Sequence, residues 1–549
     1  MNKFNYTDLK SILAIILLWF VIACETGQPM FISEDYYSDQ ILNPIDTSQE
    51  LPTALVSTKI SLASPISLND FDVHTNNSPV LASFGPGLAY SRLLRFRSGP
   101  GISLPTMATE CDLCERWTQL NPTTYEFYLR DNAYWHDAEP VFGRKVVADD
   151  IIQSFMRQLS SNNANAEILK DIKTMESSDE AVIRITINSP NADFLSNLAQ
   201  GASKIIPIEI NKTGIFDINQ VVGSGPWVWA SQQGVQGYYF DSNKRYFEEG
   251  IPYSDKLEIQ IIADYQTRLT AFLLGKIDIL EFSRDRIPVS KLQEYNIPTT
   301  QQIDFSSGVV LSLNTLAEPL DHIGIRRKII QSVDPWLAIT EIWDDLGFVG
   351  LGVPLFDEKW LIPRQDMEVY LKAVDSGSFK TNGSIDNTEN ITITVADYGS
   401  RYMDYGNRVA DSIRNLGVRV TVDSLNINEY ASEVWNRGSY QIFVGPSMPF
   451  QSTNSYLSSV FHSRGKYNIH NYRDEYLDLM IDRQSRELDL VARKKILIDL
   501  QKHIMENAFW LMPVGNIAYW AHQDHVMNFY PNTFGSEYFY FSKIWIDAI

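Results

Sequence analysis

Cysteine is scarce in this chain, which has three among its 549 residues, at positions 24, 111 and 114. A structural zinc site needs four ligands, and Cys111 and Cys114 have no second pair of cysteines to complete a set. A redox-active CxxC pair belongs at a helix N-terminus in a thioredoxin-like unit, whereas CDLCERW leads into a strand-like segment. Redox activity is therefore the least favoured role. The sequence leaves open whether the pair is a local disulfide or two unreactive thiols.

Basic residues are also in short supply, with 46 Lys and Arg against 67 Asp and Glu and a formal net charge of −21. Such an excess of negative charge argues against a general nucleic-acid binder and against a polybasic membrane binder. Hydrophobic residues make up 44% of the chain and charged residues 21%, which is the composition of a folded globular protein. A chain of this length normally divides into two or three domains.

Long apolar runs are rare, and the clearest one covers residues 12–23. It is too short to span a bilayer but has the length of a signal-peptide core. The stretch Val21-Ile22-Ala23-Cys24 resembles the lipobox of bacterial lipoproteins. This resemblance predicts a signal peptide over residues 1–23 and lipidation of Cys24, with a plain secretory signal as the alternative. Residues 24–54 are polar and acidic, and we predict a flexible tether.

Sequence signatures of catalysis are missing as well. There is no GxSxG elbow, P-loop or dinucleotide fingerprint. Asp149 and Asp150 are neighbours on a predicted helix, so they do not face each other as glycosidase carboxylates would. His522 and His525 are spaced for chelation on a helix, but no third ligand is linked to them, and we predict a solvated turn. No catalytic residue, metal site or cofactor is predicted.

Alternating strand-like and helix-like segments fill the rest of the chain. In residues 124–129 the apolar side chains alternate, as in a half-buried strand, and residues 147–159 have helical spacing. Residues 391–398, 408–417 and 418–425 read as strand, helix and strand, with Gly417 placed to terminate the helix. This βαβ unit predicts parallel strands in an α/β domain.

Five segments together resemble one family, the extracytoplasmic solute-binding proteins of ABC transporters, family 5, which includes oligopeptide, dipeptide and nickel binders. The first reads YEFYLRDNAYWHDAEPVFGRKVVADDIIQSF and matches the family pattern "tFkLR-gvkFHDG-pltA-DV-fSf". The others follow in the family order and spacing, at residues 222–227 with 243–246, 273–279, 313–334 and 505–515. The resemblance extends from about residue 57 to about residue 528.

The resemblance implies an α/β protein with the two-lobed periplasmic-binding-protein type II fold, a hinge, and an extra inserted domain. The first lobe would be discontinuous in sequence. The expected boundaries are residues 55–90, 204–310 and 506–549 for lobe I, 91–203 for the inserted domain, and 311–505 for lobe II. In this family, His136 and Asp137 mark a turn between a strand and a helix and do not form an active site.

The resemblance also suggests where a ligand would lie. In peptide-binding relatives a loop corresponding to residues 443–455 carries an aspartate that pairs with the peptide amine, and Pro449 stands at or near that place. The loop has no acidic residue, and a buried ammonium without a carboxylate would be costly. We expect a neutral or weakly charged ligand, and the predicted ligand-binding residues are Phe84, Gly85, Tyr398, Tyr402, Tyr405, Ser447, Met448, Phe450 and Asn454.

The implied function is that of a lipid-anchored, monomeric receptor outside the cytoplasm that captures a small solute and delivers it to the permease and ATPase subunits of an ABC importer. The solute could be a peptide, an opine, an oligosaccharide or a chelate, and no nucleic acid is involved. Two alternatives remain open, a secreted hydrolase on a similar lobed fold and a ligand-sensing receptor without transport. The first requires paired carboxylates or a nucleophile in the cleft.

Overall fold

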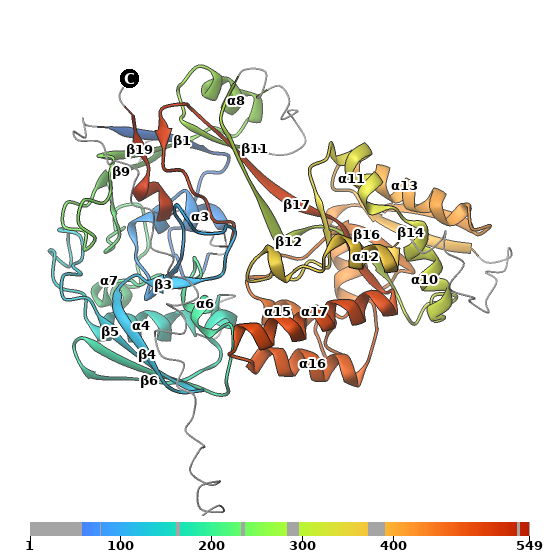
Figure 1. Ribbon diagram of the computed structural model, residues 1–549. Coiled ribbons are helices and arrows are strands. Elements are labelled where there is room, and N and C mark those ends of the chain that lie inside the picture. Colours follow the sequence, from blue (N-terminus) through green and yellow to red (C-terminus); the bar gives the residue numbers. More distant parts are fainter. Residues whose placement is uncertain are drawn as a thin grey trace, which may run out of the picture.

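The computed structural model describes residues 58–547 except 77, 161–164, 232–235, 283–291, 293–295, 372–389 and 535–538. The predicted signal peptide, Cys24 and the predicted tether lie outside the described residues. Two bodies lie side by side and are joined by two long strands (Figure 1). The first body comprises the described residues of 58–298 and 523–547, and the second body comprises those of 314–509.

The first body contains two four-stranded sheets. One has the order β1-β10-β9-β8, with a parallel β1–β10 pair and antiparallel neighbours. Its strands are β1 (Lys59–Ser64), β10 (Lys256–Ile261), β9 (Gly237–Ser242) and β8 (Trp227–Trp229). Alternate residues such as Leu257 and Ile259 are 0–1% exposed, because successive side chains of a strand point to opposite faces.

The second sheet of the first body is antiparallel, in the order β4-β5-β7-β6. Its strands are β4 (Cys114–Asn121), β5 (Thr124–Leu129), β7 (Val182–Ile187) and β6 (Ile172–Asp179). The prediction that Tyr125, Phe127 and Leu129 face one way is confirmed, since all three are buried. Ile151 and Phe155 of helix α4 (Ala148–Gln158) belong to the same hydrophobic core.

Shorter elements complete the first body. The helices are α3 (Pro79–Ser83), η1 (Pro86–Ala89), α5 (Ala166–Leu169), α6 (Phe194–Leu198), α7 (Ile208–Thr213), α8 (Tyr265–Leu273) and η6 (Phe539–Lys543). Two small antiparallel sheets pair β2 (Leu94–Phe96) with β3 (Thr109–Cys111) and β18 (Val526–Met527) with β19 (Trp545–Ile546).

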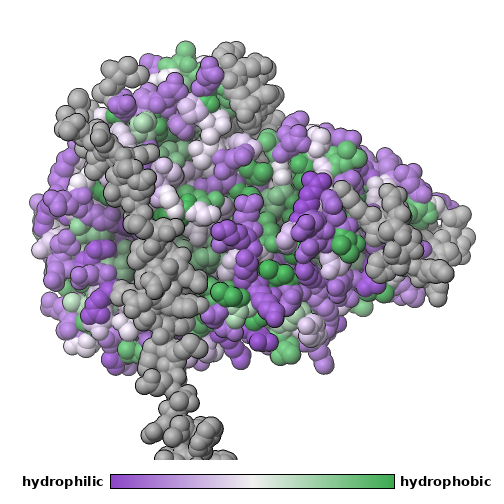
Figure 2. Space-filling model, viewed as in Figure 1, coloured by the Kyte–Doolittle hydropathy of each residue, from purple (hydrophilic) through white to green (hydrophobic). Residues whose placement is uncertain are grey.

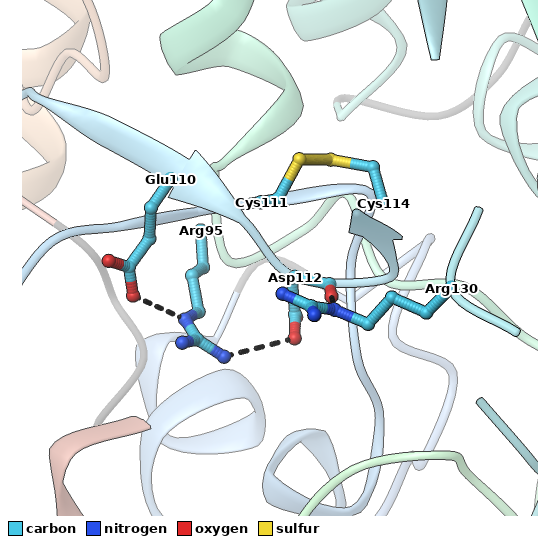
Figure 3. The surroundings of a disulfide bond; sticks show 6 residues. All are labelled: Arg95, Glu110, Cys111, Asp112, Cys114 and Arg130. Atoms are coloured by element: carbon cyan, nitrogen blue, oxygen red, sulfur yellow. Dashed lines mark hydrogen bonds and ion pairs between the residues drawn. A yellow bond between two sulfur atoms is a disulfide. The ribbon is translucent and has the colours of Figure 1, made fainter. Parts of the chain in front are cut away.

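The two cysteines of the CDLC motif form a disulfide between the end of β3 and the start of β4. The intervening Asp112 accepts a hydrogen bond from Arg95 Nη1 at 3.4 Å, and Arg95 Nε binds Glu110 at 2.7 Å (Figure 3). The bond therefore closes a tight turn within a network of buried charges. Of the alternatives that the sequence left open, the local disulfide is the one that the structure contains.

The second body is built on the larger part of a sheet of seven strands that begins in the first body, in the order β11-β17-β12-β16-β14-β15, with β13 paired to β17. The predicted βαβ unit is confirmed: β14 (Asn390–Ala396) and β15 (Arg419–Leu425) are parallel and α13 (Ser400–Arg414) connects them. Gly417 has φ +87°, the left-handed conformation expected of a glycine after a helix. The remaining strands are β11 (Ile279–Phe282), β13 (Phe348–Gly350) and β16 (Ile442–Pro446).

Helices pack on this sheet around one hydrophobic core. They are α10 (Ile323–Ser332), α11 (Pro335–Trp343), η2 (Glu358–Trp360), α12 (Arg364–Leu371), α14 (Ile427–Tyr430), η4 (Ala431–Asn436), α15 (Thr453–Tyr456), η5 (Leu457–Phe461), α16 (Glu475–Arg486) and α17 (Leu490–Asn507). Among the described residues, none of the helices has both the length and the apolar composition needed to cross a membrane.

The long strands β12 (Thr299–Leu313) and β17 (Trp510–His522) connect the two bodies. They are antiparallel neighbours from the Thr299–Ala521 pair to the Ser312–Trp510 pair, with irregularities between Asp304 and Gly308 and between Val309 and Leu311. Toward the first body β17 pairs with β11, and toward the second body β12 pairs with β16. We call β12 and β17 the hinge strands. The expected boundary at residues 310–311 falls inside β12, and the domain division given above remains a proposal.

Candidate functional site

The His136 side chain lies in a buried turn, not in a cleft. Its Nε2 is 3.0 Å from the Gly225 carbonyl oxygen, and Gly223 N donates to its Nδ1 at 3.3 Å. The backbone N–H of His136 also donates to the Gly223 carbonyl. Burial lowers the pKa of His136 to about 4, so the ring is neutral at physiological pH. These contacts agree with a structural role that ties residue 136 to the 223–225 turn.

The carboxylate of Asp150 is likewise a structural anchor. The side chain is 0% exposed and accepts hydrogen bonds from both terminal nitrogens of Arg144, at 2.7 and 2.8 Å. The Trp135 indole N–H and the backbone N–H of Ile208 also donate to it. A carboxylate with this many fixed donors has no free oxygen lone pair directed at a substrate.

The predicted turn is present at residues 524–525, but His522 is the last residue of β17 and the His525 side chain, 30% exposed, is paired. His525 Nε2 lies 3.0 Å from Asp278 Oδ1, and the other carboxylate oxygen accepts a hydrogen bond from Ser61 N at 2.6 Å. The pair joins segments 247 residues apart, which local sequence does not reveal. Within the described ranges, no group of three or more His, Cys, Asp or Glu side chains could hold a metal ion.

Four residues form a row across the sheet where the hinge strands enter the second body. Gly515 of β17 lies opposite Phe348 of β13 on one side and Gly308 of β12 on the other. Ser447, directly after β16, donates its backbone N–H to the Gly308 carbonyl at 2.9 Å. We call Phe348, Gly515, Gly308 and Ser447 the hinge row. It marks the edge of the second body that faces the first.

The glycines of the hinge row permit unusually close packing. A Cβ atom added at Gly308 would lie 2.4 Å from the Val514 carbonyl oxygen and 2.8 Å from Gly515 Cα. A Cβ atom added at Gly515 would lie 2.3 Å from the Phe348 ring. Both distances are well inside van der Waals contact, so only glycine fits without displacement of a strand or a ring.

One end of the hinge row continues into the loop of residues 447–454, which we call the ligand loop. Ser447 Oγ donates to the Ser306 carbonyl and accepts from Gly308 N, both at 3.1 Å. Met448 and Phe450 are half-buried against the core of the second body, and Phe450 packs edge-on against Tyr456. Pro449 is exposed. The loop thus offers apolar side chains and backbone groups and no charge.

Tyr398 and Tyr402 lie at the same edge of the sheet. They follow β14, which runs parallel to β16 with Val395 opposite Val444, so the segments after both strands emerge together. Tyr398 is 50% exposed, and its ring centroid lies 5.8 Å from that of Tyr402. Tyr405 is different. Its side chain is 0% exposed and packs against Trp343, so it has no surface available to a ligand, and the prediction that it binds one is wrong.

Phe84 and Gly85 belong to the first body, directly after α3. Phe84 is half-buried and its ring lies 6.2 Å from that of Phe541. Gly85 is buried, and an added Cβ would approach Leu68 Cδ1 to 2.7 Å. These two residues therefore lie on the opposite body from the ligand loop, as the two-lobed arrangement requires.

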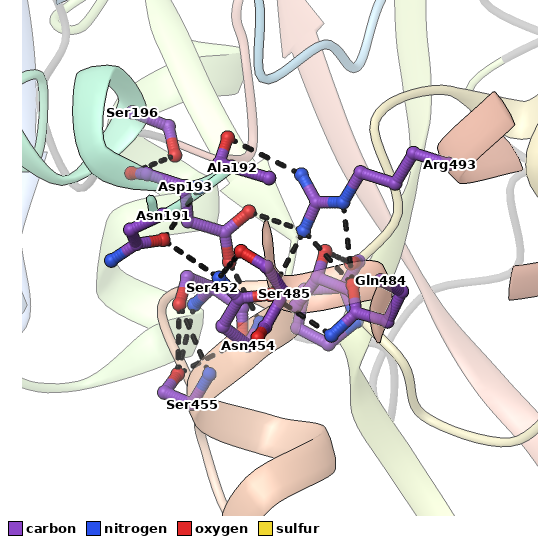
Figure 4. Close-up of polar contacts among 12 residues, drawn as sticks. Asn191, Ala192, Asp193, Ser196, Ser452, Asn454, Ser455, Gln484, Ser485 and Arg493 are labelled. Atoms are coloured by element: carbon purple, nitrogen blue, oxygen red, sulfur yellow. Dashed lines mark hydrogen bonds and ion pairs between the residues drawn. The ribbon is translucent and has the colours of Figure 1, made fainter. Parts of the chain in front are cut away.

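Asn454 has a different role from the one predicted. Its backbone N–H donates to Asp193 Oδ2 and its side-chain amide donates to Asn191 Oδ1, both at 2.7 Å (Figure 4). Its side-chain oxygen accepts from Gln484 and Arg493. Because these protein groups use both ends of the amide, Asn454 connects the two bodies and is not free to bind a ligand.

A pocket of about 650 Å³ opens at the other end of the hinge row, beside Phe348. This volume is in the usual range for small-molecule sites. Ser103 of the first body contributes to its wall, and the nearby Met107 N–H donates to the Phe356 carbonyl of the second body at 3.2 Å. The other lining residues are Trp336, Ile339, Thr340, Asp345, Gly347, Phe348, Val349, Glu358, Lys359, Leu361, Ile362, Pro363, Arg364 and Met367.

The pocket residues were not predicted from sequence. Its floor is apolar, with Ile339, Val349, Ile362 and Met367 buried, while charged side chains such as Arg364 lie at the rim. A partial signal existed in the apolar run of residues 335–343, but periodicity alone does not distinguish a pocket wall from a core. In the space-filling view, apolar residues are interspersed with hydrophilic ones over the visible face, and several lie near the middle of the molecule (Figure 2).

Comparison with known proteins places these features in a family context. The family model described as bacterial extracellular solute-binding proteins, family 5 middle, matches residues 108–468. The probable di/tripeptide-binding protein 5 of Pseudomonas aeruginosa is 23% identical over 510 residues, which cover 87% of this chain and 94% of that protein. The heme-binding protein A of Haemophilus influenzae is 25% identical over 282 residues, which cover 47% of this chain and 50% of that protein.

Solved structures share the fold. HbpA2 from Haemophilus parasuis superposes with a TM-score of 0.73 at 18% identity, covering 89% of this chain and 100% of that one. NikA from Brucella suis, in complex with Fe(III)-EDTA, gives a TM-score of 0.70 at 17% identity with the same coverage. Together with the two-bodied architecture, these matches confirm the predicted α/β fold of the periplasmic-binding-protein type.

Proposed function

The chain belongs to the bacterial extracellular solute-binding proteins of family 5, which bind without catalysing, and from this premise we propose that it captures a small solute between its two bodies and delivers it to an ABC importer. The solute would lie over the hinge row. The ligand loop, Tyr398 and Tyr402 would contact it from one side and the 650 Å³ pocket from the other. Phe84 and Gly85 would close over it from the first body. A secreted hydrolase is set aside because the family binds and does not catalyse.

The observation that carries the proposed ligand class is the charge of the ligand loop. Residues 443–455 contain no acidic side chain, and the nearby carboxylate of Asp193 is 1% exposed and already paired with Arg493 at 2.5 Å. A free ammonium in this part of the site would be buried without a partner. We therefore propose a ligand without a free amine at this position, such as an opine, an oligosaccharide, an N-blocked peptide or a metal chelate.

The names of the relatives indicate a wide range of possible solutes. They include di/tripeptide-binding and heme-binding proteins, and one structural neighbour of the same fold, AgaA, is in complex with agropinic acid. Differential affinity for the closed arrangement would let the solute draw the two bodies together about the hinge strands. The closed form would then dock on the permease.

Native mass spectrometry of the purified full-length protein tests this proposal, since a captured solute should remain bound and reveal its mass. Small-angle scattering with peptides, opines, oligosaccharides and chelates should then show a smaller radius of gyration for one class. If no solute is retained and no class compacts or stabilises the protein, the proposal fails.

We also propose that Cys24 is lipidated and that the receptor is held at the outer face of the cell membrane. The lipobox-like stretch before Cys24 supports this. A Cys24→Ala variant should move from the membrane fraction to the soluble extracytoplasmic fraction, as judged by fractionation and by the mass of the mature N-terminus. Unchanged membrane association of the variant would contradict the anchor.

A further inference from the structure

A buried ion pair joins the two bodies away from the hinge strands. Asp193 lies directly before α6 in the first body, and Arg493 lies in the first turn of α17 in the second. Arg493 Nη2 is 2.5 Å from Asp193 Oδ1, and the two side chains are 4% and 1% exposed. The residues are 300 positions apart in sequence. Figure 1 places α6 next to α15 and α17, below the hinge strands.

Each charge of this pair has additional hydrogen-bond partners. Asp193 Oδ2 accepts from Asn454 N at 2.7 Å, and the guanidinium of Arg493 also donates to Gln484 Oε1 at 3.2 and 3.3 Å (Figure 4). Such satisfaction is required, because a buried ion pair that loses one partner leaves an uncompensated charge. We call Asn191, Asp193, Asn454, Gln484 and Arg493 the Asp193 seam.

The seam holds the second half of the ligand loop. Asn454 binds Asp193 and Asn191, and the Gln451 carbonyl accepts a hydrogen bond from the Gln200 side chain of the first body at 2.8 Å. The first half of the loop is held differently, through Ser447 and the hinge strand β12. The two ends of one loop are thus tied to different parts of the molecule.

Separation of the two bodies would therefore act on the loop unequally. Ser447 would keep its bonds to β12. Asn454 would lose Asp193 and Asn191 and keep its partners in the second body, which are Gln484, Ser485 and Arg493. The freed carboxylate and guanidinium would be hydrated, so a polar seam can open and close where an apolar core would resist exposure to water.

We propose that Asp193 and Arg493 are positioning residues that hold the ligand loop in its ligand-ready conformation when the bodies are together and release it when they separate. The role of the loop in ligand binding rests on the proposed solute-capture function. The contacts predict that the loop and the two bodies are coupled whether or not that function is correct. Loop order and body separation should change together, as expected when two events share one coupling free energy.

Spin-label distances in the ligand-free, full-length protein test the link. Labels at the exposed positions Lys173 of the first body and Arg483 of the second report on their separation, in a background in which Cys24 is replaced by serine. Asp193→Asn should shift the distance distribution to longer values. The control Asp366→Asn, which breaks an ion pair within the second body, should leave the distribution unchanged.

Amide hydrogen exchange reports on the loop itself. In Asp193→Asn, the amide of Asn454 should exchange at least about tenfold faster, while the amide of Gly308 should keep its parental rate. The double variant Asp193→Asn/Arg493→Gln leaves no unpaired charge, so it should fold like the parent and show the same two changes. Parental distances or parental Asn454 exchange in the double variant would overturn the proposal. None of these readouts needs a solute, so failure to find a ligand would leave them intact.

Discussion

At the scale of single residues, charge and burial decide which polar side chains are available to a ligand. His136, Asp150 and Asn454 all have the chemistry of a binding or catalytic group, yet each is consumed by hydrogen bonds within the protein. Tyr398 is half exposed, whereas Tyr405, seven positions later, is fully buried. The candidate site is therefore composed mainly of aromatic, aliphatic and neutral polar side chains, with charged side chains at the rim of the pocket.

The missing carboxylate of the ligand loop can be supplied by one substitution. Pro449→Asp places an acid at the exposed position where peptide-binding relatives are expected to have one. We expect the variant to bind a free-amine tripeptide at least about tenfold more tightly than the neutral control Pro449→Asn, because a charge-assisted hydrogen bond contributes about 1.5–3 kcal/mol. Isothermal titration measures the difference, and equal affinities would argue against the proposed ligand geometry.

His136 is expected to affect stability and not binding. His136→Ala removes the partner of Gly223 N and one of the two partners of the Gly225 carbonyl, which keeps its bond from Asn243, and leaves a cavity. The free energy of unfolding should fall by about 2–4 kcal/mol in urea denaturation. The matched variant His322→Ala alters a histidine whose side chain is 76% exposed and should stay within about 0.5 kcal/mol of the parent. A specific loss of solute binding at unchanged stability would reverse this assignment.

At the scale of elements, the hinge strands set the geometry of the site. β12 and β17 are the strands through which the sheet of the second body reaches the first, and their glycines at positions 308 and 515 allow the backbones and the Phe348 ring to approach closely. The hinge row places the ligand loop and the pocket at the two ends of one line. A change in the register of these strands would move both ends together.

Gly308→Ala should disturb this register. The new Cβ would meet the backbone of β17, which cannot rotate away as a side chain could. We expect a loss of about 2 kcal/mol or more in the free energy of unfolding. Thr299→Ala, at an exposed position on the same strand, is the control and should change little. If both variants were equally stable, close packing at Gly308 would not constrain the hinge.

At the scale of the whole molecule, three histidines in different parts of the structure are buried and neutral. Burial lowers the pKa of His74 and His136 to about 4 and that of His470 to about 3. All three rings contact backbone carbonyl oxygens. Both bodies therefore carry groups that resist protonation in the folded state but accept a proton readily in the unfolded chain.

This distribution predicts a loss of stability in mild acid. Below pH 6.5 the unfolded histidines bind protons and the folded ones do not, so the stabilisation present at neutral pH is lost as the pH falls toward 4. Each histidine should contribute about 1.4 kcal/mol per pH unit in this window. Urea unfolding at pH 7, 6 and 5 measures the slope, which should be shallower in His470→Gln. A flat profile for the parent would contradict the burial of these rings.

Local patterns were enough to predict part of the fold and part of the site. The alternation of residues 124–129 and the helical stripe of residues 408–417 reflect the periods of a strand and a helix, which neighbouring residues determine among themselves. Motifs in a fixed order led to the family, and the charge of the ligand loop is a direct count. The sequence left a local disulfide and two unreactive thiols as alternatives, because the spacing of two cysteines does not show whether their thiols meet.

From the sequence alone, periodicity predicted a βαβ unit of an α/β domain, and the resemblance of five ordered motifs predicted a solute-binding protein of family 5. A direct count showed that the ligand loop carries no charge. Only the tertiary structure decided which side chains of that loop are free to contact a ligand. The Asp193–Arg493 pair, the Asp278–His525 pair and the pocket beside Phe348 all depend on segments far apart in the chain. Their contacts arise when the sheets and the two bodies pack, and no short-range pattern encodes which distant partner each polar group will meet.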